Sequence, residues 1–100
     1  MAAYLIVSYD VVDRDRYAGY VPGVMPLLRK HGAEVLVADY SAEALEGDRR
    51  GVYVVLKFES EAAALGFYND PDYAPIKKIR LDASANGSAA LVKGFAPPSG

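Results

Sequence analysis

The chain has 100 residues, of which 52% are hydrophobic and 24% charged, and its formal net charge is −2, all of which is typical of one soluble globular domain. Acidic and basic residues are mixed without a basic block, which argues against nucleic acid and anionic membranes as partners. The absence of cysteine excludes disulfides, thiolate catalysis and cysteine-ligated metals, and is typical of the reducing cytoplasm.

The start of the chain is apolar but short. No basic segment precedes the run from Met1 to Val7, and Ser8 and Asp10 end it, so we expect neither a signal peptide nor a membrane span. We expect a single domain over residues 1–96 and a flexible tail over 97–100.

The first half of the chain predicts three strands and one helical region. Residues 3–10, 33–39 and 52–59 are short, apolar and rich in β-branched and aromatic side chains, which favours strands. Between the first two, apolar residues recur at helical spacing from Tyr17 to His31, with Asp13 as N-cap and Gly32 as the stop. Two prolines, at positions 22 and 26, predict a kink or two short helices there. Residues 40–51 form a polar connection with two glycines.

The second half predicts two helical pieces and a last strand. Ser60 is a good N-cap for a helix that ends before residues 69–72. A second piece spans about 73–82, the Asn86-Gly87 pair predicts a turn, and residues 88–95 form the final strand. The order β-α-β-β-α-β predicts an α+β, ferredoxin-like fold: a four-stranded antiparallel sheet with both helical regions on one face.

The other face of this sheet is only half polar. Alternation along the strands directs one set of side chains toward the helices: Leu5, Val7, Tyr9, Val35, Val37, Val52, Val54, Leu56 and Phe58. The opposite set is Tyr4, Ile6, Leu36, Ala38, Tyr53 and Val55, edged by Ser8, Glu34, Lys57 and Glu59. This face is too apolar for a solvated surface and too polar for a closed core. We expect a second copy of the chain to cover it in a homodimer; the alternative is a modest exposed patch.

Several short motifs follow one another along the chain in a characteristic order. They are Glu46-Gly47 before the third strand, Val52 to Phe58, Glu59-Ser60, Phe67-Tyr68, Asp72-Tyr73, Ile76, Arg80 and a final Lys93-Gly94. This order resembles the uncharacterised bacterial family called domain of unknown function thirteen-thirty, over nearly the whole chain. Phe67 stands where that family usually has Trp, Asp72 where it has Glu, and Ala33 where a second glycine is common.

The resemblance implies the dimeric α/β-barrel fold. Relatives in that superfamily include cofactor-free monooxygenases, isomerases of ring compounds and proteins without an assigned activity, so the fold alone does not determine the function.

Among the charged residues, Arg80 is the strongest candidate for a role in binding. Tyr73, Ile76 and Arg80 fall on one helical face, and a guanidinium holds a carboxylate through a planar fork of donors. Arg80 is then an anchor for an acidic ligand, with Tyr68 or Tyr73 supplying a hydroxyl. The alternative is a structural ion pair with Glu46, Asp70 or Asp72.

Other candidates have alternatives of the same kind. Glu46 is a possible general base if buried, or else a solvated turn residue. His31, the only histidine, suits the end of a helix, where the free carbonyls favour a donor. The eight tyrosines are core or interface residues, or they line a pocket.

The sequence therefore predicts a ligand site without assigning a reaction. Its residues are Tyr17, Glu46, Tyr68, Tyr73 and Arg80; no catalytic residue, metal or cofactor is assigned. The first hypothesis is a homodimer that binds a small carboxylated or aromatic molecule beside the sheet. The alternatives are an enzyme resembling a cofactor-free monooxygenase or isomerase, and a non-catalytic dimerisation or regulatory module.

Overall fold

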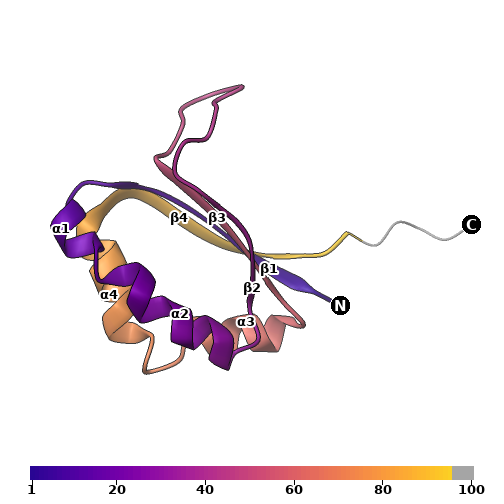
Figure 1. Ribbon diagram of the computed structural model, residues 1–100. Helices are drawn as coiled ribbons and strands as arrows, with labels where there is room; N and C mark the ends of the chain where they lie inside the picture. The colour runs from indigo at the N-terminus through magenta and orange to yellow at the C-terminus, as the bar shows by residue number, and fades with distance from the viewer. Residues whose placement is uncertain (96–100) are drawn as a thin grey trace, which may run out of the picture.

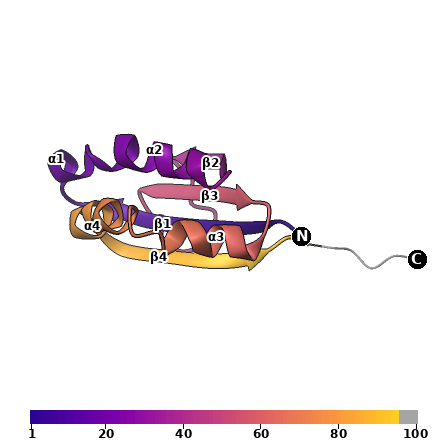
Figure 2. The same cartoon turned by 90° about the horizontal axis from the view of Figure 1, so that it is seen from below.

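The computed structural model describes residues 1–95 as a four-stranded sheet with all the helices of this segment on one face (Figures 1 and 2). The elements are β1 (Ala3–Val11), α1 (Arg14–Tyr17), α2 (Tyr20–Lys30), β2 (Glu34–Asp39), β3 (Val52–Phe58), α3 (Glu61–Tyr68), α4 (Ala74–Ala83) and β4 (Ser84–Lys93). The strands are antiparallel in the order β2-β3-β1-β4, which confirms the predicted ferredoxin-like fold. The predicted tail, 97–100, lies outside the described residues. No helix in residues 1–95 has the length and apolar character needed to cross a bilayer.

The core lies between the two central strands and the helices. Leu5 of β1 is opposite Leu56 of β3, and both point to the helix side as the alternation predicts. Tyr9, Val52 and Phe58 on the same side are each 1% exposed. Full burial of such a side chain contributes roughly 1.5–3 kcal/mol, so this layer holds the helices onto the sheet.

The first helical region is divided into two helices, as expected. Asp13 caps α1 by accepting a hydrogen bond from the Arg16 N–H at 3.1 Å. The chain then starts α2 after Gly19, while Pro26 lies inside α2. Pro22 has no N–H to donate to the Ala18 carbonyl, as a continuous helix would require, so the division lies one turn before this proline. At the far end, Gly32 has φ +67°, a left-handed conformation that glycine adopts without strain, and it ends the helix.

The Asn86-Gly87 pair does not form the predicted turn. It lies within β4, where both residues oppose Tyr9 in a β-bulge, and the strand begins at Ser84, directly after α4. Asn86 has φ +56°. The left-handed preference that makes this dipeptide frequent in turns serves the bulge equally well.

The face assignment of β2 is wrong beyond its middle. Val35 is opposite Leu56, but Val37 is opposite Val55, so one extra residue interrupts the register. The interruption reverses the alternation, as any one-residue shift does. Val37 therefore shares the open face with Val55, and Ala38 turns to the helix side, the reverse of the prediction for both residues.

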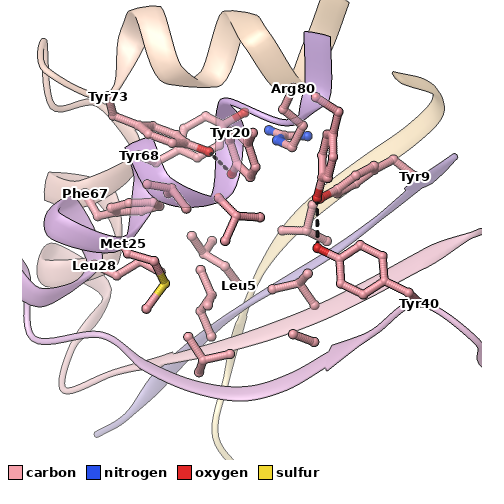
Figure 3. Close-up of a pocket in the computed structure, with 18 residues that line it drawn as sticks. Leu5, Tyr9, Tyr20, Met25, Leu28, Tyr40, Phe67, Tyr68, Tyr73 and Arg80 are labelled. Carbon is pink, nitrogen blue, oxygen red and sulfur yellow. Dashed lines mark hydrogen bonds between the residues drawn. The ribbon is translucent and has the colours of Figure 1, made fainter. Parts of the chain in front are cut away.

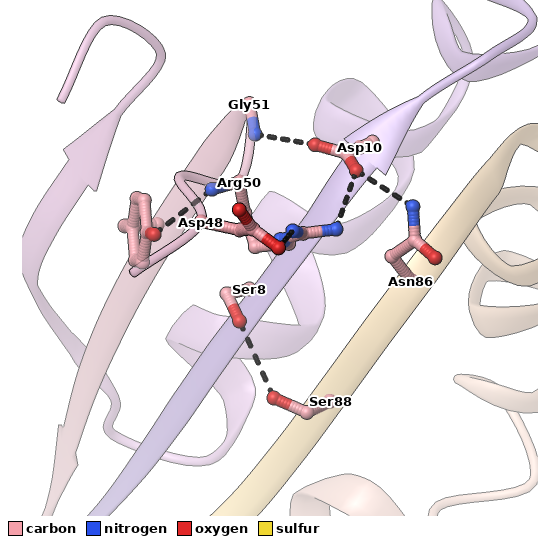
Figure 4. A network of polar contacts seen from close by, with 8 residues as sticks. Ser8, Asp10, Asp48, Arg50, Gly51, Asn86 and Ser88 are labelled. Carbon is pink, nitrogen blue, oxygen red and sulfur yellow. Dashed lines mark hydrogen bonds and ion pairs between the residues drawn. The ribbon is translucent and has the colours of Figure 1, made fainter. Parts of the chain in front are cut away.

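The connection between β2 and β3 projects beyond the open face of the sheet (Figure 1). Its end is held by Asp10 of β1, whose carboxylate accepts hydrogen bonds from the Gly51 N–H at 2.7 Å, Arg50 at 2.9 Å and Asn86 at 3.0 Å (Figure 4). The hydrogen bonds from Asn86 and Gly51 lower the pKa of Asp10 below its usual value. This network joins β1, β4 and the loop. The open face itself keeps exposed apolar side chains, among them Ile6 at 44% exposure.

Candidate functional site

A cavity of about 110 Å³ lies between the sheet and the helices (Figure 3). Apart from Tyr9 of β1, the wall formed by the two central strands is aliphatic: Leu5, Val7, Val54 and Leu56. Its helix wall is largely aromatic and carries the polar groups: Tyr17, Tyr20, Val24, Leu28, Phe67, Tyr68, Tyr73 and Arg80. An apolar lining with a few polar groups is typical of small-molecule sites, and this cavity is smaller than their usual range of about 300–1,000 Å³.

Arg80 brings a positive charge into this cavity. The residue lies in the last turn of α4, is 4% exposed, and its Nε has no hydrogen-bond partner. Its Cζ is 5.5 Å from the ring centroid of Tyr9 and 5.9 Å from that of Tyr20. These are cation–π distances, which compensate part of the lost hydration of the guanidinium.

The structural ion pair considered for Arg80 is not formed. Asp70 is bound by Lys30 at 2.8 Å and by His31 at 2.7 Å, and Asp72 lies 3.6 Å from Lys30. Every ion pair within residues 1–95 is made by other residues. A buried guanidinium without a carboxylate is unusual, because an unpaired buried charge costs several kcal/mol.

Tyrosine hydroxyls, rather than carboxylates, surround the charge. Tyr20 and Tyr73 share a hydrogen bond of 2.8 Å on one side of Arg80 (Figure 3). Tyr9 and Tyr17 share one of 2.6 Å, and Tyr40 continues this second chain at 3.1 Å from Tyr17. The hydroxyls therefore form one pair and one row of three.

Arg80 and the hydroxyls of Tyr9, Tyr17 and Tyr20 keep fixed protonation states near neutral pH. Burial raises the pKa of Tyr9, Tyr17 and Tyr20 above 10.0, so all three hydroxyls keep their protons. Burial by itself would lower the pKa of Arg80, but the oxygens of Tyr20 and Tyr73 outweigh it, and the pKa is raised. The cavity thus combines one permanent cation with the neutral hydroxyl groups of these three tyrosines.

The mouth of the cavity lies between α2 and β2. The lining residues exposed to solvent are all found there: Val21, Met25, Val35, Ala38 and Tyr40. This rim is apolar apart from the Tyr40 hydroxyl. A molecule entering from solvent would pass it before it reached Arg80.

Four of the five predicted site residues meet in this cavity. Tyr17, Tyr68, Tyr73 and Arg80 line it, whereas Glu46 is exposed in the loop between β2 and β3 and does not. The predicted role of all five in binding remains a prediction. Burial, the condition set for Glu46 as a general base, is not met in this structure.

Three tyrosines of the site were not predicted from the sequence. Tyr9 and Tyr20 were assigned to strand and helix stripes without a role in the cavity, and Tyr40 was placed in a polar connection. The inward position of Tyr9 in its strand was a usable signal for the first of them. His31 is the C-cap residue of α2, and it contacts Asp70 outside the cavity.

Residues 2–95 match the model of a protein family, DUF1330, which is described as a domain of unknown function. The chain belongs to the DUF1330 family. No curated protein matches it. The family assignment confirms the resemblance drawn from the order of the motifs, and it supplies no ligand or reaction.

Solved structures share the fold of this DUF1330 protein at low sequence identity. A protein of unknown function from Rhodopseudomonas palustris has a TM-score of 0.81 and 17% identity, covering 96% of this chain and 84% of that one. A dimeric ferredoxin-like protein of unknown function from Jannaschia sp. has a TM-score of 0.76 and 14% identity, covering 94% and 100%. SnoaB, a cofactor-independent oxygenase from Streptomyces nogalater, has a TM-score of 0.65 and 11% identity, covering 96% and 95%. At these identities the likeness shows the fold alone.

Proposed function

We propose that the protein binds a small organic acid, with the acid group at Arg80 and the rest of the molecule in the cavity. The observation that carries this proposal is the buried guanidinium without a carboxylate partner. An anionic ligand would supply the missing charge, and charge-assisted hydrogen bonds in a site shielded from water are stronger than neutral ones. The apolar wall would take the rest of the ligand.

We infer that the binding protein is a homodimer joined through its open sheet face. The Jannaschia protein of the same fold is described as dimeric, and Ile6, Leu36 and Val37 of this chain are each at least 40% exposed. Covering these side chains with a second copy removes apolar surface from water. The ligand cavity lies on the opposite, helix side of the sheet, so each protomer would keep its own site.

Calorimetric titration with propionate and butyrate tests the binding proposal. We expect both acids to bind the wild type, and Arg80→Gln to weaken them at least about tenfold, since a hydrogen bond to a charged group is worth roughly 1.5–3 kcal/mol. Arg29→Gln is the matched control, because Arg29 is exposed on α2 and lies away from the cavity lining. Equal affinities of wild type and Arg80→Gln for both acids would refute the proposal.

The likeness to SnoaB raises a second candidate, an oxygenase without cofactor. Such a reaction needs a group that accepts a proton from the substrate, and neither Glu46 nor His31 lines the cavity. Only tyrosine hydroxyls remain there, and burial raises the pKa of three of them. Binding is therefore the better supported function. Equal inactivity of wild type and Arg80→Ala on a panel of quinols and lactones would count against the oxygenase.

A further inference from the structure

The polar groups that line the cavity are almost all hydrogen-bond donors without negative charge. Arg80 is the one charged residue among those that line it, and apart from the Met25 sulfur its other polar side-chain atoms are tyrosine hydroxyls. The lining contains neither a carboxylate nor a second cation. It therefore offers strong donors at one end and an apolar surface elsewhere.

A count of hydroxyl protons identifies one further donor beside Arg80. Tyr20 and Tyr73 have two hydroxyl protons but share a single hydrogen bond, and within residues 1–95 neither hydroxyl has another side-chain or backbone acceptor. One proton of the pair therefore remains available. Arg80 cannot accept it, because a guanidinium only donates. A ligand atom that accepts from both Arg80 and this pair satisfies all three groups.

We propose that the ligand is a small monocarboxylate with a short apolar tail; this inference rests on the proposed function and specifies its ligand class. The carboxylate accepts from the guanidinium and from the free hydroxyl of the Tyr20–Tyr73 pair. The tail lies among Leu5, Leu28 and Phe67. Tyr20 and Tyr73 are positioning residues that orient the carboxylate.

The same set of lining residues disfavours amino acids and dicarboxylic acids as ligands. The ammonium group of an amino acid would lie beside the Arg80 cation or against the aliphatic wall, without an anionic acceptor. The second carboxylate of a dicarboxylic acid would be buried without a counter-charge. Each of these groups would lose its hydration on binding, and the cavity offers no opposite charge to offset that loss.

The volume limits the tail. An engineered cavity of about 150 Å³ holds benzene, so about 110 Å³ encloses a somewhat smaller molecule. Longer tails would emerge past Val21 and Met25 at the mouth. We expect the affinity to rise about fourfold for each added methylene, from 0.8 kcal/mol per buried methylene, and to level off once the tail reaches solvent.

Four probes of similar size test the class: butyrate, butyramide, succinate and 4-aminobutyrate, each titrated into the wild-type protein by calorimetry. We expect butyrate to bind at least about tenfold more tightly than the other three. Succinate or 4-aminobutyrate binding as tightly as butyrate would overturn the monocarboxylate assignment while leaving Arg80 as an anion site. Failure of all the acids to bind would refute the proposed function itself.

Tyr73→Phe tests the positioning role. We expect this variant to reduce the ratio of butyrate to butyramide affinity, a ratio that a purely structural defect would leave unchanged. Tyr4→Phe on the open sheet face is the control and should keep the wild-type ratio, because Tyr4 does not line the cavity. An unchanged ratio in Tyr73→Phe would remove the hydroxyl pair from the recognition of the carboxylate.

Discussion

Replacing Arg80 by methionine should stabilise the ligand-free protein. Burying the guanidinium costs several kcal/mol. Two cation–π contacts, with Tyr9 and Tyr20, return about 1 kcal/mol each, and nearby hydroxyl oxygens return a similar amount. Methionine fills nearly the same space without the charge and packs well against aromatic rings. We therefore expect a net gain of about 1–3 kcal/mol, or about 4 °C or more in Tm for a domain of this size.

The assay is thermal unfolding of wild type, Arg80→Met and Arg80→Lys, without ligand and with an excess of butyrate. Arg80→Lys keeps the charge and should show no gain. Butyrate should raise the Tm of the wild type and leave that of Arg80→Met unchanged, because a ligand stabilises only the folded state that binds it. A loss of more than about 1 kcal/mol in Arg80→Met would refute the reasoning, since it would show that the folded protein satisfies the guanidinium by itself.

Three further predictions concern the rest of the molecule. Hydrogen bonds from Lys30 and His31 hold the pKa of Asp70 well below 3.8, so its contribution to stability is complete above that pH and is lost as the pH falls further. The Tm difference between wild type and Asp70→Asn should accordingly shrink between pH 5 and pH 2; a constant difference would contradict this. Ile6→Lys should give the mass of one chain in light scattering, because it places a charge on the open sheet face; an unchanged dimer mass would exclude that face as the interface. Ser60→Ala should lower the free energy of unfolding by about 1 kcal/mol in urea titrations, because Ser60 accepts the Ala63 N–H at the start of α3; no change in the urea midpoint would show that water replaces the cap.

The order of the elements could be predicted because local patterns carry it. Asp13 and Ser60 cap helices at the positions where their side chains accept backbone N–H groups, and Gly32 ends α2 where a positive φ is required. Such signals act over a few residues, so the sequence alone is enough to predict them. The same holds for the alternation of β1 and β3, whose inward residues form the core.

Longer-range features could not be predicted in the same way. The extra residue in β2 reversed the faces of Val37 and Ala38, and the bulge at Asn86 depends on what β1 presents opposite it. Both depend on register between strands, which a single strand does not encode.

The sequence by itself determined the fold class and the common helical face of Tyr73 and Arg80, because short-range spacing sets them, while the family followed from the order of motifs along nearly the whole chain. The tertiary structure alone decided that Asp70 and Asp72 are taken by Lys30, that Glu46 stays exposed in a loop, and that tyrosine hydroxyls surround Arg80. Partners of a buried charge come from segments far apart in the chain, and only packing brings them together or keeps them apart.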